Sequence, residues 1–483
     1  MGESTLKEKT SKGLFWGGLS NGLLQLMNLL FAVIIGRILD PSDFGVVGVL
    51  TIFSAIASTM QESGFTAALV NRKEVDARDY NSVFWFNVLM SAALYLLLFF
   101  LAPFIARFFH NPVLVRLSRF TFLGFLIGSL GTAQNAWLLK HMKVKQKSLA
   151  SIIAVVVAGT LAVVLALNGF SYWGIAIQNV ASVTINTLCL WIASSWRPSF
   201  HVSLRRAWDM FGFSVKILIT NVVAMANYHL FSVVFGRYYS EYEVGVYNQA
   251  NKWNAAGYST IDGMVHSVVL PALVEARDDK VRQTRVFRKM IRFVAFVSFP
   301  LMLGLSLIAP DFITIFLTDK WAESGSLLRL LCVGGSVYSI ATVMILLIIS
   351  HGGSGVQMWN SIAMGIVQVI ICVCFFRFGV NAMVVASMTV NVGWLLIWHR
   401  CVNRYLSYAV WDFLKDIGFY ALVAVAVMVV TYFSTMLIGN IYLRCIGRIA
   451  LAAALYILVM HLTGSAIFKE SVHFVMSRIK HGK

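Results

Sequence analysis

Runs of about twenty apolar residues recur along nearly the whole chain, and they constrain its fold more than any other feature. Each run is long enough to cross about 30 Å of hydrocarbon as an α-helix. A bilayer core offers no water to backbone groups, so a chain crosses it only as helices or as a closed barrel. A content of 59% hydrophobic and 12% charged residues over 483 positions excludes an ordinary soluble protein. The sequence therefore predicts an all-α integral membrane protein.

We count about fourteen transmembrane helices. The candidate spans are residues 13–35, 44–70, 81–106, 117–139, 149–168, 173–194, 211–235, 244–272, 289–309, 325–350, 355–376, 380–399, 417–438 and 442–463. The first span follows a basic start typical of a signal peptide, but its apolar stretch is too long and no small-residue cleavage site follows. We therefore expect this span to stay in the mature protein.

The distribution of Lys and Arg predicts the orientation. With the N-terminus inside, the inside segments hold 27 of these residues and the outside segments hold 10. Basic loops stay on the cytoplasmic side, so we expect both termini there. The net charge of +18 then reflects topology and attraction to anionic lipid head groups. Nucleic acid is not an expected partner, because no soluble basic module presents the charge.

A stretch near the N-terminus returns two hundred positions later without a gap. Gly36-Arg37 matches Gly236-Arg237, and Glu62 matches Asp262. The other matched positions are Ser20-Asn21 with Thr220-Asn221, residues 43–46 with 243–246, and Ala55 with Ala255. Shared hydrophobicity alone does not reproduce rare intramembrane polar positions, so we interpret the match as an internal duplication.

The duplication predicts two homologous six-helix lobes, residues 1–196 and 209–402, joined by a cytoplasmic linker at 197–208. Because each lobe has an even number of spans, the copies share one orientation and enclose a central cleft. Helices 13 and 14 and a cytoplasmic tail, residues 403–483, lie outside the duplication. We expect them to be an added lipid-facing pair.

Polar residues inside the predicted spans are the candidate functional residues. In the first span Asn21, Gln25 and Asn28 share one helix face, and the seventh span holds Lys216 and Asn221. In the eighth span a face of amides and aromatics has Lys252 alongside; its members are Tyr247, Asn251, Asn254, Tyr258 and Asp262. Such faces turn away from lipid, and they either line a substrate path or pack against another helix.

The six cysteines lie mostly in apolar runs. We expect them to behave as small buried hydrophobic residues and to form no disulfide and no zinc site.

Amides and aromatic faces suit sugar hydroxyls and pyranose rings, and a cation suits phosphate. Asp40 to Asp43 form a tight turn after the first span, in which Pro41 is suited to starting the next helix.

The arrangement resembles the polysaccharide flippases of the multidrug/oligosaccharidyl-lipid/polysaccharide (MOP) exporter superfamily. The resemblance rests on two six-span lobes, a Gly-Arg-(x)5-acid-x-Gly turn after the first span, residues 63–65 (Ser-Gly-Phe), a basic N-terminus and fourteen spans. Residues 39–45 are most similar to the O-antigen, exopolysaccharide and colanic-acid-type branch. The likeness covers nearly the whole chain.

This resemblance implies a V-shaped, alternating-access flippase. It would move undecaprenyl-pyrophosphate-linked oligosaccharide from the inner to the outer leaflet of a bacterial cytoplasmic membrane, in lipopolysaccharide or exopolysaccharide biosynthesis. It would be no enzyme and would need no cofactor beyond a coupling proton or sodium ion, which Glu62 and Asp262 are candidates to bind. Its expected partners are membrane lipids, a polysaccharide polymerase and other assembly proteins.

Four cations are candidates for the diphosphate, in falling order Lys252, Lys216, Arg37 and Arg237. The two arginines sit near outer helix ends, and an alternative role is to brace these turns against Asp43 and Glu243.

Three other functions stay open. A cation-coupled multidrug exporter of the same superfamily would need an acidic or apolar pocket, whereas the excess of Lys and Arg favours an anionic substrate. A peptidoglycan-precursor flippase shares lobes and ligand type. A membrane glycosyltransferase or polymerase usually needs a large extramembrane loop, catalytic carboxylates or metal ligands.

Overall fold

The computed structural model is α-helical, with short 3-10 turns and no strand over the residues it describes, 3–62, 76–200 and 204–481. In residues 3–19, 21, 61–62, 77, 204–217, 220 and 474–481 only the backbone is described. The prediction of an all-α fold is confirmed. The chain forms two compact units, residues 1–245 and 246–483, which are described in turn.

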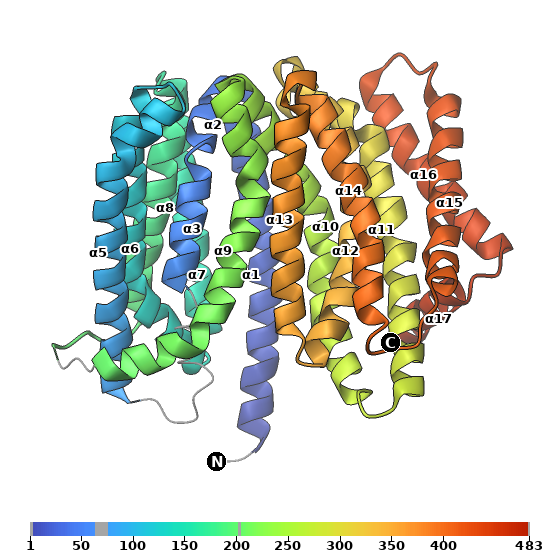
Figure 1. Ribbon diagram of the computed structural model, residues 1–483, viewed down its shortest axis with the longest axis horizontal. Helices are drawn as coiled ribbons and strands as arrows, with labels where there is room; N and C mark the ends of the chain where they lie inside the picture. Colours follow the sequence, from blue (N-terminus) through green and yellow to red (C-terminus); the bar gives the residue numbers. More distant parts are fainter. Residues whose placement is uncertain (1–2, 63–75, 201–203, 482–483) are drawn as a thin grey trace. The chain divides into compact units, whose positions relative to one another are not determined.

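The first unit contains the helices of the predicted spans one to seven (Figure 1). They are α1 (Glu3–Ile38), α2 (Pro41–Gly48), α3 (Thr51–Glu62), α5 (Ala77–Phe108), α6 (Val113–Lys140), α7 (Val144–Leu167), α8 (Ser171–Ala193) and α9 (Leu204–Tyr238). Helix α6 packs against α5 and α8, α7 against α1 and α8, and α9 against α3 and α5. The compact units are defined by contacts between helices, whereas the predicted lobes are defined by the sequence repeat. The units therefore do not test the lobe boundaries, which remain a prediction.

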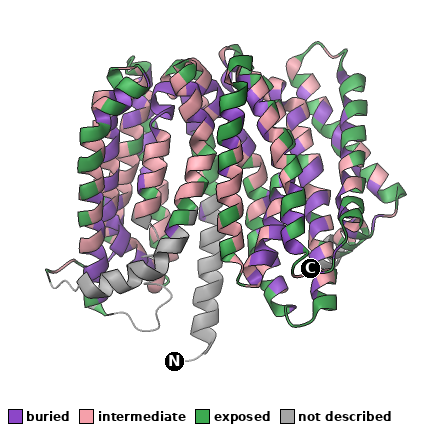
Figure 2. Ribbon diagram, viewed as in Figure 1, coloured by how far each residue is buried: buried purple, intermediate pink, exposed green. Residues whose placement is uncertain are grey.

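The second unit contains the remaining helices, and α10 begins in the last residues of the first unit. They are α10 (Glu241–Glu275), α11 (Lys280–Leu317), α12 (Ala322–Ser350), α13 (Ser354–Phe375), α14 (Val380–Val402), α15 (Val410–Thr435), α16 (Ile441–Leu462) and α17 (Ala466–His481), with 3-10 turns at Asp319–Trp321 and Phe376–Phe378. Helix α12 is the most buried of the candidate spans and packs against α11, α13 and α14 (Figure 2).

Within the described residues, ten helices are long and apolar enough to cross a membrane, or eleven if the bent pair of α1 and α2 is one span. Each of the fourteen predicted spans overlaps a helix, and the second overlaps both α2 and α3. The count of fourteen crossings and the arrangement of two lobes around a cleft remain predictions.

Helix boundaries follow the two-hundred-residue repeat. Helices α1 and α9 end at Ile38 and Tyr238, and α2 and α10 begin at Pro41 and Glu241. The break between α1 and α2 bends the chain by 120°. The Asp40 backbone N–H donates to Asp43 Oδ2 at 3.1 Å, and Pro41 occupies the first turn of α2, where its missing N–H is not needed. The predicted turn is thus confirmed.

Two matched glycines bring the starts of α2 and α10 together inside the first unit. A Cβ on Gly45 would overlap the carbonyl oxygen of Glu241, and a Cβ on Gly245 would overlap the carbonyl oxygen of Pro41. Residues 41 and 241 are themselves equivalent in the repeat, so the contact is reciprocal. Only glycine allows the two backbones to approach this closely, which explains why both copies carry it.

Helices α15 and α16 pack against α11. Near the beginning of α11, Arg288 and Arg292 both bond Asp416 of α15 (Nε–Oδ distances of 2.8 and 2.7 Å). The Tyr408 hydroxyl donates to the same carboxylate at 2.8 Å. Burial, together with Asp416, raises the pKa of the Tyr408 phenol, so it remains a proton donor at neutral pH. The Asp416 side chain is only 2% exposed.

Near the other end of α11, the acid lies on α11 itself and the arginines lie on α16. Asp311 of α11 accepts two bonds from Arg444 of α16, at 3.0 and 2.7 Å, and one from Arg448 at 2.8 Å. The exposed fractions of the Asp311 and Arg448 side chains are 5% and 7%. Each clamp thus pairs one carboxylate with two guanidinium groups, the geometry in which buried charges are best satisfied.

We predict that Asp311→Ala destabilises the protein by about 3–5 kcal/mol, because it leaves a buried arginine without its counter-charge. The exposed pair of Glu275 and Arg282, with exposed fractions of 73% and 57%, provides the matched control. Glu275→Ala should change stability by at most about 1 kcal/mol. The midpoint of thermal unfolding in detergent compares the variants, and equal midpoints would contradict the clamp's structural role.

Candidate functional site

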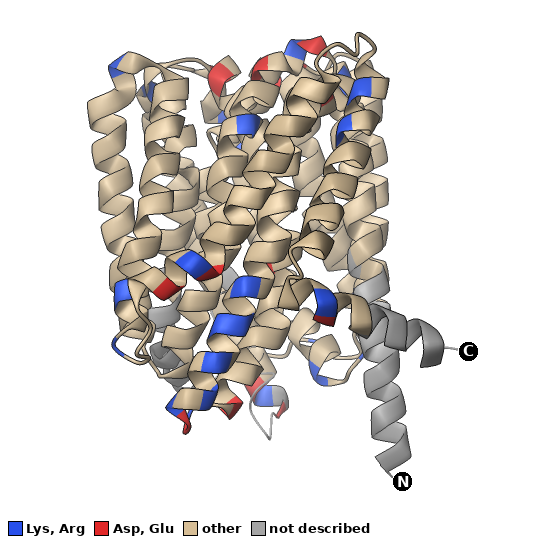
Figure 3. Cartoon of the chain, turned by 90° about the vertical axis from the view of Figure 1, so that its right-hand side faces the viewer, with Lys and Arg blue, Asp and Glu red and all other residues tan. Residues whose placement is uncertain are grey.

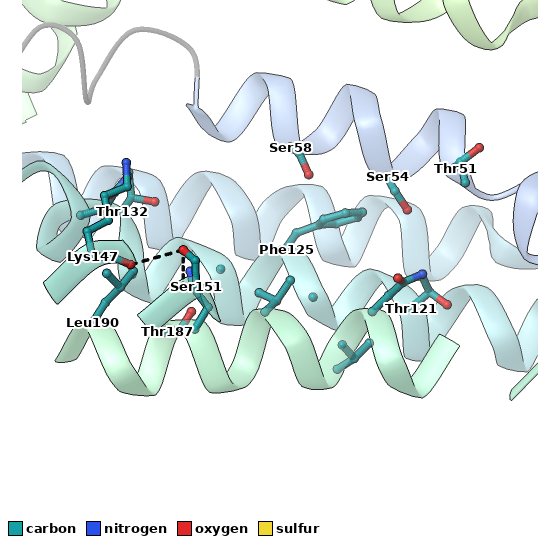
Figure 4. A pocket seen from close by; sticks show the side chains of 18 of the residues that line it. Thr51, Ser54, Ser58, Thr121, Phe125, Thr132, Lys147, Ser151, Thr187 and Leu190 are labelled. Carbon is teal, nitrogen blue, oxygen red and sulfur yellow. Dashed lines mark hydrogen bonds between the residues drawn. The ribbon is translucent and has the colours of Figure 1, made fainter. Parts of the chain in front are cut away.

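A cavity of about 920 Å³, lined by both apolar and polar side chains, lies within the first unit between α3, α6, α7 and α8 (Figure 4). Most of its polar lining consists of hydroxyl and amide groups. These belong to Thr51, Ser54, Ser58, Thr121, Thr132, Asn135, Ser151, Asn179, Asn186 and Thr187, and Lys147 supplies a cation. None of the described side chains that line the cavity is acidic. Such a lining suits water and polyhydroxylated ligands, and it offers no carboxylate to a cationic one.

Small residues on α6 make room for this cavity. Gly124, Gly128 and Gly131 recur at three- and four-residue steps and line one wall. No atom lies within 4 Å of the place that a Cβ on Gly124 would occupy. Ser54 and Ser58, one helical turn apart on α3, point toward the cavity from the opposite wall (Figure 4).

Part of the polar lining is already hydrogen-bonded. The Ser151 hydroxyl lies 3.3 Å from the Lys147 carbonyl oxygen and 3.4 Å from Asn186 Oδ1, and the Thr187 hydroxyl donates to the Ile127 carbonyl at 3.4 Å. The sequence prediction missed this cavity. The available signal was the glycine repeat on the predicted span 117–139, together with the two asparagines of α8.

The predicted polar face of α10 is directed partly into the second unit. Tyr247 and Asn254 are buried, and a Cβ on Gly335 of α12 would meet Asn254 Oδ1 at only 2.5 Å. The Tyr258 ring packs against the Tyr338 ring at an interplanar angle of 35°, with 4.3 Å between ring centroids. Asn251 is half-buried. These residues therefore contribute to helix packing, one of the two roles that the sequence left open.

Lys252 occupies a different face of α10. It is exposed, as are Ser259 and Thr260, seven and eight positions further along and hence on the same side of the helix. Lys252 lies eleven residues from the start of α10, about 17 Å along the helix axis at 1.5 Å per residue. Lys252 belongs to the predicted eighth span, residues 244–272. A cation that faces lipid within such a span is not stable and requires water, a counter-charge or a ligand.

The structure describes the side chains of only some of the candidate residues on α1 and α9. Gln25, Asn28 and Asn221 are exposed. The side chains of Asn21, Lys216 and Glu62 lie outside the described residues.

Of the two arginines at the ends of α1 and α9, Arg37 is exposed and Arg237 is half-buried. Arg237 lies 2.6 Å from a ring nitrogen of His110 and 5.2 Å from the Phe108 ring centroid. Asp43 accepts hydrogen bonds from the Ser171 hydroxyl and the Asp40 backbone N–H. These contacts hold the turn between α1 and α2 and the end of α9.

Asp262 lies one helical turn before His266 on α10, with 3.8 Å between Oδ2 and the imidazole Nε2. The Asp262 side chain is 21% exposed, and its Oδ1 has no hydrogen-bond partner among the described residues. No cluster of His, Cys, Asp and Glu in the described part of the chain has the arrangement of a metal site.

The ten long apolar helices of the described part of the chain define a multi-pass membrane protein. A family model described as "Polysaccharide biosynthesis protein" matches residues 34–326, and the chain belongs to this family. It is 24% identical over 342 residues to the lipopolysaccharide biosynthesis protein WzxC of Escherichia coli (strain K12), covering 70% of this chain and 69% of that protein.

A second relative is the succinoglycan biosynthesis transport protein ExoT of Rhizobium meliloti (strain 1021), 24% identical over 356 residues, 74% of this chain and 72% of that protein. Among solved structures, the lipid II flippase MurJ in an inward closed conformation matches 92% of this chain and 98% of that chain, with a TM-score of 0.77 and 15% identity. An inward-facing multidrug transporter of the MOP superfamily matches with a TM-score of 0.64 and 15% identity, over 79% and 95% of the chains. The fold and family expected from the sequence are confirmed, and these names describe transport and biosynthesis proteins, not catalysts.

We predict that the cavity is hydrated. In a variant without its native cysteines, Ser54→Cys and Ser58→Cys should react quickly with a water-soluble thiol reagent, since both side chains border the cavity. Ala57→Cys is the matched control on the same helix, because Ala57 is only 2% exposed. Labelling rates measured by mass spectrometry compare the three, and a rate at residues 54 and 58 as low as at residue 57 would show a dry cavity.

Proposed function

We propose that the protein is a flippase for undecaprenyl-diphosphate-linked oligosaccharide repeat units. It moves them by alternating access from the inner to the outer leaflet of a bacterial cytoplasmic membrane, with both termini in the cytoplasm. The family and the names of the relatives support sugar-polymer biosynthesis as the context. A polymerase and other assembly proteins would then act on the delivered unit.

The observation that carries the proposal is Lys252, an exposed cation eleven residues into the 35-residue helix α10, which contains the predicted eighth span. Diphosphate and sugar cannot cross hydrocarbon without polar groups that replace their water. An ammonium group meets the first need, and the neighbouring Ser259 and Thr260 hydroxyls add hydrogen-bonding capacity. The hydroxyl- and amide-lined cavity of the first unit has the chemistry that suits sugar hydroxyls.

The same observation separates the alternatives. A pocket for cationic drugs would place carboxylates where Lys252 and the acid-free cavity lie, so an anionic substrate is favoured over multidrug export. A peptidoglycan-precursor flippase would use the same cation, and the glycan used in the assay distinguishes it. For a glycosyltransferase or polymerase, neither the cavity nor the exposed face of α10 offers the pair of acids or the metal ligands that such chemistry uses.

We predict that Lys252→Ala slows flipping by about tenfold to a hundredfold, the effect of losing one charge-assisted hydrogen bond. The assay uses purified protein in liposomes that contain a labelled undecaprenyl-diphosphate oligosaccharide. It follows how fast an outside glycosidase gains access to the inner-leaflet pool.

Lys252→Arg should retain part of the activity, and Lys145→Ala, which removes an exposed lysine at the start of α7, should be close to wild type. Flipping by the wild type with normal rates in Lys252→Ala would remove this residue from the site. No acceleration over protein-free liposomes, with several glycans and imposed ion gradients, would overturn the flippase itself.

We further propose that Asp262, with His266 beside it, binds a coupling cation, and that the matched Glu62 does the same in the other copy of the repeat. The Asp262 side chain is only 21% exposed and its Oδ1 has no hydrogen-bond partner among the described residues, which supports a bound cation. Asp262→Asn combined with Glu62→Gln should leave a flipping rate that no longer responds to an imposed proton or sodium gradient. The same gradient response in the double variant as in the wild type would refute coupling through these carboxylates.

A further inference from the structure

The second unit has a basic cavity of about 1070 Å³ that is separate from the groups used above. It lies between the beginning of α11, the beginning of α15 and the segment that leads into α17. Its cationic lining residues are Lys280, Arg285, Arg288, Lys289, Arg292 and Lys415, against only two carboxylates, Asp416 and Glu470. Figure 3 shows Lys and Arg at successive turns in the lower part of α11. The cavity therefore carries an excess of positive charge.

Both carboxylates are already committed to other groups. Asp416 is bonded by two guanidinium groups and a phenol, and Glu470 pairs with Lys289 at 2.6 Å. Lys280 and Arg285 form no ion pair with the described residues, and Lys415 has only a distant contact with the Trp411 ring, at 5.9 Å. Three cations that line the cavity thus lack a counter-charge.

Asp416 also fixes the donors of the cavity wall. Arg288 and Arg292 each use Nε and Nη2 on this carboxylate, so each keeps its Nη1 amino group for a further partner. Guanidinium groups held in this way are preorganised for oxyanions, because little side-chain freedom remains to be lost on binding. Phosphate oxygens accept charge-assisted hydrogen bonds from such amino groups.

The rest of the lining is apolar and aromatic. Phe419 is 39% exposed, Val281 is 70% exposed, and Tyr420, Ala466 and Ile467 also border the cavity. Both α11 and α15 are long and apolar enough to cross the membrane, and the cavity lies at the charged beginning of each. A ligand here meets phosphate-binding cations next to surface suited to hydrocarbon. A free phosphate would use the first feature only, whereas a lipid uses both.

We propose that this cavity binds the phosphate head group of an anionic membrane lipid. The head group is either the phosphodiester of an ordinary anionic phospholipid or the diphosphate of a polyprenyl carrier, which share the same recognition chemistry. Binding depends on Lys280, Arg285 and Lys415, while Arg288 and Arg292 each supply an oriented Nη1 amino group. The site does not rest on the proposed flipping activity, since it shares no residue with the α10 face.

The test measures lipid binding to the full-length protein by native mass spectrometry in detergent. Titrations use phosphatidylglycerol, undecaprenyl diphosphate and, as a zwitterionic reference, phosphatidylcholine, with inorganic pyrophosphate as a competitor. The test variant combines Lys280→Gln, Arg285→Gln and Lys415→Gln. All three side chains are exposed, so the variant loses charge without leaving a buried group unpaired.

The matched control combines Lys140→Gln, Lys143→Gln and Lys145→Gln, which removes the same charge from another predicted inside loop. We expect the cavity variant to lose about a hundredfold in affinity for anionic lipid, the usual effect of three basic residues near such a surface, and the control to bind as the wild type does. Stronger binding of phosphatidylglycerol identifies a bulk-lipid site, and stronger binding of undecaprenyl diphosphate identifies a carrier site.

Equal binding by both variants and the wild type, or equal losses in both variants, would overturn the proposal. Displacement of lipid by pyrophosphate supports the phosphate as the recognised group. Lys252→Ala should bind lipid at this cavity as the wild type does. The test of the head-group site is therefore independent of the test of the flipping site.

Discussion

The neutralisation of charge at the two ends of α11 is the constraint on which the second unit depends. A membrane-spanning helix cannot leave an acid or a guanidinium group facing hydrocarbon, and here each buried acid receives two arginines. The acid sits on α15 in the clamp near the beginning of α11 and on α11 itself in the clamp near its end. One clamp has its arginines on α11 and the other has its acid on α11. Only one register of α15 and α16 against α11 therefore satisfies both clamps. The outer faces of the pair remain apolar, with Leu422 73% and Phe433 67% exposed.

The first unit depends on backbone proximity instead of charge. Its close contact joins Gly45 to Glu241 and Gly245 to Pro41, two positions that the repeat makes equivalent. A gene duplication explains the matching glycines, since each copy must supply a surface without side chains for the other. The same argument explains why the capping turn at Asp40 to Asp43 comes directly before this contact. The turn sets the direction of α2, and the glycine then lets α10 approach.

Helix positions were predictable from the sequence because the length of an apolar run is a property of that run alone. The α2 start at Pro41 and the repeat of helix ends are examples. The orientation of α10 was not predictable to the same degree. Its periodicity groups Tyr247, Asn254 and Tyr258 on one face, but periodicity does not tell whether that face meets α12 or a substrate. Lys252, named from its charge, lies on the neighbouring exposed face.

The clamps and cavities depend on partners that sequence spacing does not reveal. Asp416 and Arg288 are 128 residues apart. In the sequence the arginines of α11 are only a run of basic residues, because the carboxylate that binds them lies far along the chain. Asp416 removes one unit of charge from the basic cavity and yet makes that cavity a better anion site, because it holds two guanidinium groups in place. Acids that are fully used by arginines build the fold, and the cations left without an acid are the ones available to a ligand. By this criterion Lys252, Lys280, Arg285 and Lys415 are the residues that we propose for binding, whereas Arg444 and Arg448 hold α16 against α11.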